Sequence, residues 1–287
     1  MKTWNVPSAP CWADLSAADP RAAARFYGSL FGWELGEVPG LDGYHAFLSE
    51  GRTVGGLGPR RGGRRSPVWQ PYFLVEEAEA EPGAAADGPE ETPAERVALA
   101  RGQVLGEPVE VPGVCRATLC ADSSGAVFGL WEPDGHRGFD TVNAPGSAAW
   151  FGLTTTDPDG ARGFYGEVFG WQARRAAPGA GFPYTEWSLG GQPFGGMTPV
   201  TEAFPAGMRP RWLVYVSVRD CDAAAARGAR LGANVLLPPT TIEPGRFSVL
   251  ADPQGAMFAV IALAREDVGP GGGRPAAGGE REAAMMG

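Results

Sequence analysis

The sequence has almost no lysine and few histidines or cysteines. Of its 24 basic residues, Lys2 is the single lysine, so catalysis through a lysine Schiff base is effectively excluded. The two histidines, His45 and His136, are interpreted as a strand residue near a turn and a linker residue. The cysteines contain no C-x-x-C pair, which is typical of small buried apolar side chains. They are Cys11, Cys115, Cys120 and Cys221.

Positive charge and long apolar runs are also scarce. A net charge of -9 and a pI near 4.9 argue against nucleic acid as a partner, since binding phosphates requires concentrated cationic charge. No apolar run approaches the roughly 20 residues of a membrane span, and the N-terminal stretch lacks the apolar segment of a signal peptide. We therefore expect a cytoplasmic protein that binds neither nucleic acid nor membrane. One basic cluster (Arg60, Arg61, Arg64, Arg65) is typical of a solvated loop, the alternative being contact with an anion or an acidic carrier protein.

The chain contains two similar halves. Residues 12–33 (WADLSAADPRAAARFYGSLFGW) and 150–171 (WFGLTTTDPDGARGFYGEVFGW) align without a gap, 138 positions apart (150 minus 12). Near the end of each half, the segment beginning at Asp122 matches the segment beginning at Asp252. The repeat predicts an N-terminal module over 1–134, a linker over 135–146, a C-terminal module over 147–264 and a disordered tail over 265–287.

Each half begins with the pattern of a strand, a helix and three further strands. The first strands are predicted over 11–16 and 150–155, and the Asp-Pro pairs that follow have the form of a helix N-cap with proline at the first helical position. The later strands are expected at about 33–38, 43–50 and 53–58, and near 171–176, 183–190 and 192–198.

A second unit of the same kind begins at Val68 and at Trp212. Its helix is plain at 222–227. In the first half, the corresponding stretch over 76–95 is acidic and rich in proline and glycine, so we expect that helix to be degraded or displaced.

This order of elements resembles the vicinal oxygen chelate superfamily, in particular its two-module actinobacterial members of the glyoxalase/bleomycin-resistance/dioxygenase type. The motifs that carry the resemblance are the Asp-Pro-x-x-Ala-x-x-Phe-Tyr helix, Phe-Gly-Trp and the closing Asp-x-x-Gly-Ala-x-Phe strand. The resemblance implies an α+β fold in which tandem paired βαβββ modules form two half-open mixed β-barrels. It leaves the function open, because the superfamily includes isomerases, dioxygenases, transferases and drug-binding proteins.

Enzymes of this superfamily hold a divalent metal with His, Gln or Glu on the first strand and Glu on the last strand of the paired units. The corresponding positions here are Trp12, Gln70 and Gly129 in the first half, and Trp150, Leu213 and Ala259 in the second. Trp, Gly, Ala and Leu side chains offer no metal ligand. We therefore expect no metal at these positions. We also expect no other cofactor, with a recruited flavin as the alternative that the sequence leaves open.

Strand alternation identifies the residues that share a face with these positions, most of whose side chains cannot ligate a metal. They are mostly aromatic or small, which suits a flat, partly apolar ligand. Asp14 is the exception: a carboxylate in such a pocket has its pKa raised by desolvation, as suits a general acid or base, unless a salt bridge or a backbone amide engages it. The predicted binding residues on these strands are Trp12, Gln70, Tyr72, Trp131, Trp150 and Tyr215.

Three further residues are candidates. Tyr184 and Glu186 lie two positions apart on one strand, so they can orient a phenol or an enol, or belong to the barrel surface. Arg246, on the penultimate strand, can reach a ligand oxygen or stand solvated in a hairpin.

Two main functional hypotheses follow. In the first, the protein is a metal-independent tailoring enzyme for an aromatic or polyketide-like metabolite, with Asp14, or Tyr184 and Glu186, moving protons in a cyclisation, isomerisation or cofactor-free oxygenation. In the second, the protein sequesters an aromatic drug without catalysis. A metal enzyme with relocated ligands such as His45 and Glu50 is a third hypothesis. Both modules lie in one chain, so a monomer can be complete, and a homodimer stays open.

Overall fold

The computed structural model describes residues 4, 6–38, 40–60, 66–75, 91–179, 182–202, 204 and 207–264. Three expectations fall wholly or mostly outside these residues: the solvated arginine loop, of which 61–65 are not described, the acidic stretch over 76–90, and the disordered tail from 265 onward. No helix among the described residues is long and apolar enough to cross a membrane.

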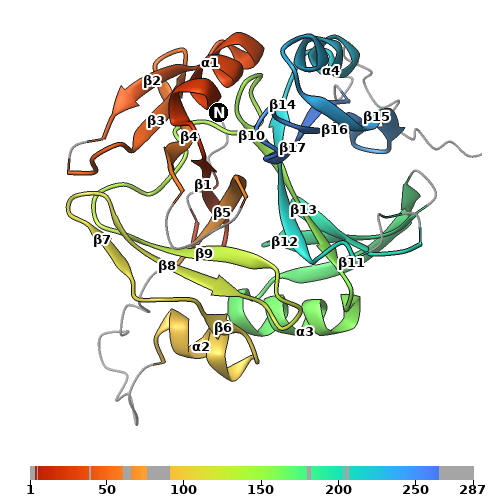
Figure 1. Ribbon diagram of the computed structural model, residues 1–287. Helices are drawn as coiled ribbons and strands as arrows, with labels where there is room; N and C mark the ends of the chain where they lie inside the picture. The colour runs from red at the N-terminus through yellow and green to blue at the C-terminus, as the bar shows by residue number, and fades with distance from the viewer. Residues whose placement is uncertain are drawn as a thin grey trace, which may run out of the picture.

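The first half of the chain forms one mixed sheet (Figure 1). Its strand order is β2-β3-β4-β1-β5-β9-β8-β6, with β7 paired to β8. β1 runs parallel to β4 and antiparallel to β5, so the two βαβββ units meet at β1 and β5. The strands are β1 (Pro10–Ala17), β2 (Glu34–Glu37), β3 (His45–Ser49), β4 (Arg52–Pro59), β5 (Val68–Leu74), β6 (Gln103–Val104), β7 (Val109–Val111), β8 (Cys115–Ala121) and β9 (Val127–Pro133).

The second half repeats the arrangement in a second mixed sheet, in the order β11-β12-β13-β10-β14-β17-β16-β15. Two mixed sheets of paired units confirm the predicted fold class, and the strands of each first unit lie where the sequence predicts them. The strands are β10 (Ala148–Thr155), β11 (Gln172–Gly179), β12 (Phe182–Leu189), β13 (Gln192–Pro199), β14 (Arg211–Ser217), β15 (Asn234–Ile242), β16 (Gly245–Ala251) and β17 (Met257–Leu263).

The helices of the first units begin at the predicted Asp-Pro caps. The Asp19 side chain accepts the Ala22 N–H at 3.0 Å at the start of α1 (Pro20–Phe31), and Gly32 ends the helix in the left-handed conformation. α3 (Pro158–Phe169) repeats this pattern with Asp157 and Gly170. In the second units, α4 (Cys221–Arg230) has ten residues and α2 (Pro93–Leu99) only seven, so the helix expected to be degraded or displaced is short and begins late.

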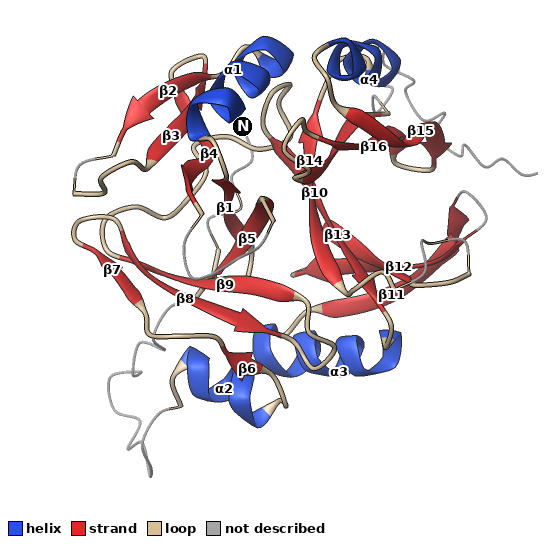
Figure 2. Ribbon diagram, viewed as in Figure 1, coloured by secondary structure: helices blue, strands red, loops and turns tan. Residues whose placement is uncertain are grey.

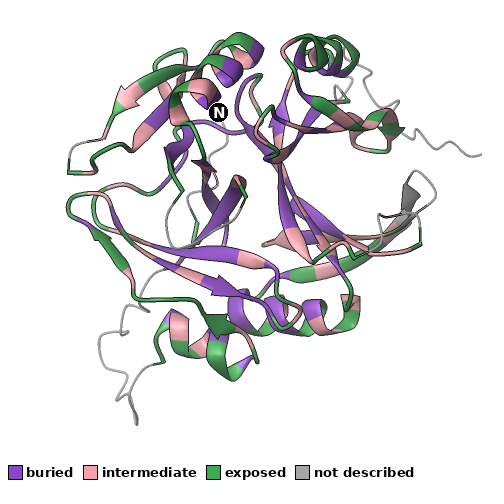
Figure 3. Ribbon diagram, in the orientation of Figure 1, coloured by how far each residue is buried: buried purple, intermediate pink, exposed green. Residues whose placement is uncertain are grey.

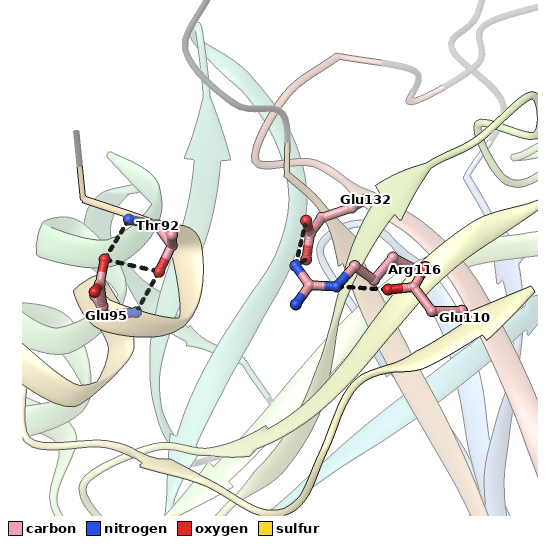
Figure 4. A network of polar contacts seen from close by, with 5 residues as sticks. All are labelled: Thr92, Glu95, Glu110, Arg116 and Glu132. Carbon is pink, nitrogen blue, oxygen red and sulfur yellow. Dashed lines mark hydrogen bonds and ion pairs between the residues drawn. The ribbon is translucent and has the colours of Figure 1, made fainter. Parts of the chain in front are cut away.

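Polar contacts at the surface fix α2 and the strands around it (Figure 4). Thr92 and Glu95 form a capping box at the start of α2, in which each side chain accepts the other residue's backbone N–H. Arg116 on β8 pairs with Glu110 of β7 at 2.9 Å and Glu132 of β9 at 3.1 Å, so one guanidinium joins three neighbouring strands.

The four helices of the described residues cover the outer faces of the sheets, with α1 beside α4 and α2 beside α3 (Figure 2). Each pair therefore joins the two halves of the chain. Buried residues concentrate on the strands and the inner helix faces (Figure 3). Phe73 of β5, for example, contacts Trp171 and Trp212 of the second half, with ring centroids 4.8 Å and 5.3 Å away.

The residues that define the repeat hold the two halves together. In the first half, the Tyr27 hydroxyl accepts the Trp69 indole N–H at 2.9 Å and donates to Asp252 of the second half at 3.0 Å. Trp212, Tyr165 and Asp122 form the same network in the opposite sense, at 2.9 Å and 3.0 Å. We call these the two Trp-Tyr-Asp networks.

Candidate functional site

The first sheet encloses a cavity of about 1120 Å³. β1, β3, β4, β5, β8 and β9 all contribute to its lining, together with residues 36–38 and 41 and several residues between 105 and 114. Most of the lining is apolar, and this volume is at the upper end of what small-molecule sites in proteins offer. The cavity is therefore large enough for a ligand of several fused rings.

Five of the predicted site residues meet in this cavity: Trp12, Asp14, Gln70, Tyr72 and Trp131. The Trp12 and Trp131 rings lie 5.6 Å apart, and the Tyr72 ring meets Trp131 edge-on at 5.8 Å. They form an aromatic wall because Trp12 and Tyr72 face one another in the β1–β5 register, while β9 follows β5 in parallel.

Asp14 brings a carboxylate into this wall. The Tyr72 hydroxyl donates a hydrogen bond to its Oδ2 at 3.1 Å. Asp14 lies directly opposite Gln70 in the antiparallel register and opposite Gly56 in the parallel register, so it stands in the middle of the sheet. A carboxylate positioned by a phenol at the wall of a cavity can accept a proton from a bound ligand.

The other polar groups of the wall are held by the protein itself. The Gln70 side-chain amide donates to the backbone oxygen of Val127 at 2.8 Å. The Trp12 indole donates to the Tyr44 hydroxyl at 3.0 Å, and this hydroxyl lies where any side chain at Gly56 would stand. The Tyr44 hydroxyl can therefore take this position only because residue 56 of the neighbouring strand is glycine.

His136 also lines the cavity, which the linker interpretation missed. Its ring meets Trp12 edge-on at 5.5 Å and Trp131 at 6.0 Å. Burial lowers the pKa of His136, and the nearby Asp140 opposes this shift only in part, so the imidazole is neutral at pH 7. The residue lies after the last strand of the sheet, where strand alternation makes no prediction.

The second sheet repeats the aromatic residues but not the carboxylate. The Trp150 indole donates to the Tyr184 hydroxyl at 2.7 Å, as Trp12 does to Tyr44. Gly152 replaces Asp14, and the Tyr215 ring fills the space beside it, 2.9 Å from where a Cβ would stand. Burial raises the pKa of Tyr184 and of Tyr215, so both phenols stay protonated at neutral pH.

The two remaining candidates make ion pairs away from the cavity of the first sheet. Glu186 pairs with Arg174 of the neighbouring strand at 2.9 Å. Arg246 makes a two-pronged contact with Asp222 of α4, at 2.6 Å and 2.9 Å, whereas the adjacent Phe247 contacts Tyr215. Arg246 therefore lies on the face of the sheet that α4 covers, and its contact with a ligand oxygen stays a prediction.

The residues at the superfamily's metal positions do not fit a metal. In addition to the side chains that lack ligand atoms, the Tyr72 ring occupies the space that any side chain at Gly129 would need. The Gln70 amide nitrogen already donates to a backbone oxygen. No group of three or more His, Cys, Asp or Glu side chains suited to a metal occurs in the part of the chain that the structure describes. We derive no step through a metal.

The fold and the repeated motifs define a class: the chain belongs to the glyoxalase-like proteins of the vicinal oxygen chelate superfamily. Residues 150–261 match the family described as glyoxalase-like domain. The anthracycline biosynthesis protein DauV of Streptomyces sp. strain C5 is 34% identical over 274 residues, which cover 90% of this chain and 94% of the relative. DnrV of Streptomyces peucetius, also described as an anthracycline biosynthesis protein, is 33% identical over 275 residues, with the same coverage.

Among solved structures, the Mn(II)-bound glyoxalase of Novosphingobium aromaticivorans superposes with a TM-score of 0.58. It is 15% identical, and the match covers 89% of this chain and 82% of the glyoxalase. At this identity the likeness concerns the fold alone.

Proposed function

We propose that the protein is a metal-independent tailoring enzyme that acts on an aromatic, polyketide-like metabolite bound in the cavity of the first sheet. The observation that carries this proposal is the Asp14 carboxylate, held by the Tyr72 hydroxyl at 3.1 Å in a wall of tryptophans. The relatives DauV and DnrV, described as anthracycline biosynthesis proteins, support a substrate of fused aromatic rings.

The shape and polarity of the cavity favour such a ligand. Trp12 and Trp131 offer flat apolar surfaces on which an aromatic ring can stack. Asp14 and Glu37 are the carboxylates among the described lining residues, and no lysine or arginine is among them. These carboxylates repel negative charge, so a neutral or cationic ring system is favoured over an anionic one.

Asp14 would begin the reaction by taking a proton from an acidic C–H or O–H group of the ligand. The carboxylate becomes a carboxylic acid, and the ligand becomes an enolate or phenolate. Tyr72 orients Asp14 through its hydrogen bond and acts as a positioning residue. Return of the proton at another atom completes an isomerisation or a cyclisation; with dioxygen as co-substrate, the same anion can be oxygenated without a cofactor.

The second candidate function is sequestration of an aromatic compound without turnover. The same aromatic wall favours it, because stacking and burial need no proton transfer. Under either function we expect a small ligand as the partner, a cytoplasmic location, and a site complete in one chain, whether monomer or homodimer.

Replacement of Asp14 by Asn separates the two functions. We expect the Asp14→Asn variant to bind anthracyclinones, followed by quenching of tryptophan fluorescence, within about threefold of the unchanged protein, and to lose about 100-fold or more in turnover followed by mass spectrometry. Glu186→Gln is the matched control, since Glu186 is a carboxylate outside the cavity. Binding without any turnover by the unchanged protein would favour sequestration.

A further inference from the structure

The loop 134–139 has a backbone that closely fits the first sheet. Gly135 has φ +100°, and a Cβ there would lie 2.7 Å from the Gly113 carbonyl oxygen. Gly138 has φ +120° and packs directly on the Cys11 carbonyl, which also accepts the Phe139 N–H at 2.8 Å. No residue with a side chain fits at either glycine without a shift, so the loop can lie this close to its neighbours only with glycine at both positions.

His136 lies between these two glycines, directly after Gly135. The backbone N–H of His136 donates to the backbone oxygen of Val114 at 3.1 Å, and its backbone carbonyl accepts the Trp131 indole N–H at 2.9 Å. The imidazole then rests edge-on against Trp12 and lines the cavity. The backbone contacts therefore fix where this ring stands.

The other N–H and O–H donors of the aromatic wall have partners within the protein. The indoles donate to Tyr44 and to the His136 carbonyl, and Tyr72 donates to Asp14. Within the residues that the structure describes, no hydrogen bond to either imidazole nitrogen of His136 is found. The ring N–H of His136 is therefore a donor available to a ligand.

We propose that His136 is a second functional group of this site: a neutral imidazole that donates a hydrogen bond to the ligand oxygen on which negative charge develops. The inference rests on the proposed function of Asp14. When Asp14 takes the proton, the ligand gains one negative charge; His136 keeps its own proton and only shares it in the hydrogen bond. The proton then returns from Asp14 to the ligand, so no oxidant or further reactant is needed.

The physical case follows from the lining of the cavity. Once Asp14 has taken the proton, the ligand oxyanion would be poorly stabilised in a mostly apolar site without a hydrogen-bond donor. The described lining residues include no lysine or arginine to supply that donor. A neutral imidazole is suitable because it donates without adding a charge that would compete for Asp14.

The test uses a coloured phenol, 2-hydroxyanthraquinone, whose visible spectrum changes when it ionises. A donor to the oxyanion lowers the pKa of the bound phenol, so we expect this pKa to rise by about one unit in His136→Phe. Phe keeps the aromatic contacts with Trp12 and Trp131 but removes the donor. His136→Gln is the matched variant, because its amide N–H keeps a donor, and we expect its bound probe to titrate within about 0.3 units of the unchanged protein.

The outcomes are distinguishable. Equal phenol pKa values in the unchanged protein and His136→Phe, with the probe bound to both, would overturn the role of His136 and leave the cavity assignment intact. Failure of the probe and of anthracyclinones to quench the tryptophans would overturn the proposed function and this inference together. If His136→Phe does not fold, the contact is tested by NMR of the imidazole nitrogens in the unchanged protein. The His45→Gln variant identifies which signals belong to His136, because the chain has only these two histidines. The His136 signal must then move when the probe binds, and an unmoved signal refutes the contact.

Discussion

Tyr72 has two roles at the scale of single residues. Its hydroxyl orients Asp14, and its ring occupies the space beside Gly129. A glycine at this position is therefore required by packing. The superfamily's last-strand Glu and the Tyr72 ring exclude one another here, which gives a physical reason why this position carries no side-chain ligand.

This exclusion predicts the effect of a side chain at position 129. We expect Gly129→Ala to lower the free energy of unfolding by about 1–3 kcal/mol, because the new Cβ overlaps a buried ring. Urea denaturation measures the change. Gly163→Ala is the control: nothing lies within 4 Å of a Cβ on this residue of α3, so alanine should stabilise the protein slightly. Equal effects at both positions would show that Tyr72 does not fill the space.

The same packing predicts that the superfamily's ligand cannot simply be restored. We expect Gly129→Glu to be destabilised and to bind no stoichiometric Mn²⁺ or Fe²⁺ in elemental analysis, because Trp12 and the engaged Gln70 amide supply no partner ligands. About one equivalent of metal in the unchanged protein would contradict our assignment and direct attention to other residues.

The buried imidazole of His136 predicts a dependence of stability on pH. Its pKa is lowered in the folded state, chiefly by burial, and is about 6.5 when unfolded, so in the window between them the unfolded chain binds the proton and the folded chain does not. This contribution is fully present above about pH 6.5 and is lost as the pH falls through the folded pKa. We expect urea denaturation of His136→Gln to show a smaller loss over this window than the unchanged protein. Parallel curves would contradict a lowered pKa.

At the scale of elements, the repeat motifs serve to join the halves. Asp122 and Asp252, in the turn before the last strand of each half, each accept a hydrogen bond from the tyrosine hydroxyl of the other half's Phe-Tyr pair. The second carboxylate oxygen of each Asp accepts backbone N–H groups of its own turn. The two Trp-Tyr-Asp networks are therefore buried, fully paired contacts between α1 or α3 and the opposite sheet. The repeated Trp, Tyr and Asp residues therefore belong to the interface between the two halves and lie outside the proposed site.

We expect Tyr27→Phe to lower the free energy of unfolding by about 1–3 kcal/mol, because the Trp69 N–H and one Asp252 oxygen lose their buried partner. Tyr165→Phe should cost a similar amount, since its network is equivalent. Urea denaturation of both variants provides the measurement, and neither should change ligand binding in the first sheet. A loss of less than about 0.3 kcal/mol in either would show that the network does not stabilise the interface.

At the scale of the whole molecule, local signals in the sequence predicted the fold well. The Asp-Pro caps and strand alternation act over a few residues, and the structure follows them. The five predicted residues that line the cavity could also be identified from the sequence, because alternation along β1, β5 and β9 places them on one face. Alternation says which residues share a face but not what covers that face, so it could not predict the ion pair of Arg246 with Asp222 of α4.

His136 was missed for a different reason. It stands in a connection without regular periodicity, and its position depends on contacts with β1 and the β7–β8 turn, which are distant in sequence. The two glycines around it were the one local signal, and glycine alone does not reveal which surface a loop approaches. The short α2 shows the same limit, because the stretch before it interrupts the repeat.

The two sheets share a topology but differ in the site, which leads to a prediction for the whole chain. The first sheet has Asp14 and the cavity, whereas in the second Gly152 replaces the carboxylate and Tyr215 fills the space beside it. We therefore expect one molecule of an anthracyclinone to bind per chain in isothermal titration calorimetry. Trp12→Phe should weaken binding about tenfold or more through loss of stacking area and of the hydrogen bond to Tyr44, while the matched Trp150→Phe should leave it within about twofold. Two equivalents per chain, or equal losses in the two variants, would show that the second sheet is a working site as well and that the halves have not specialised.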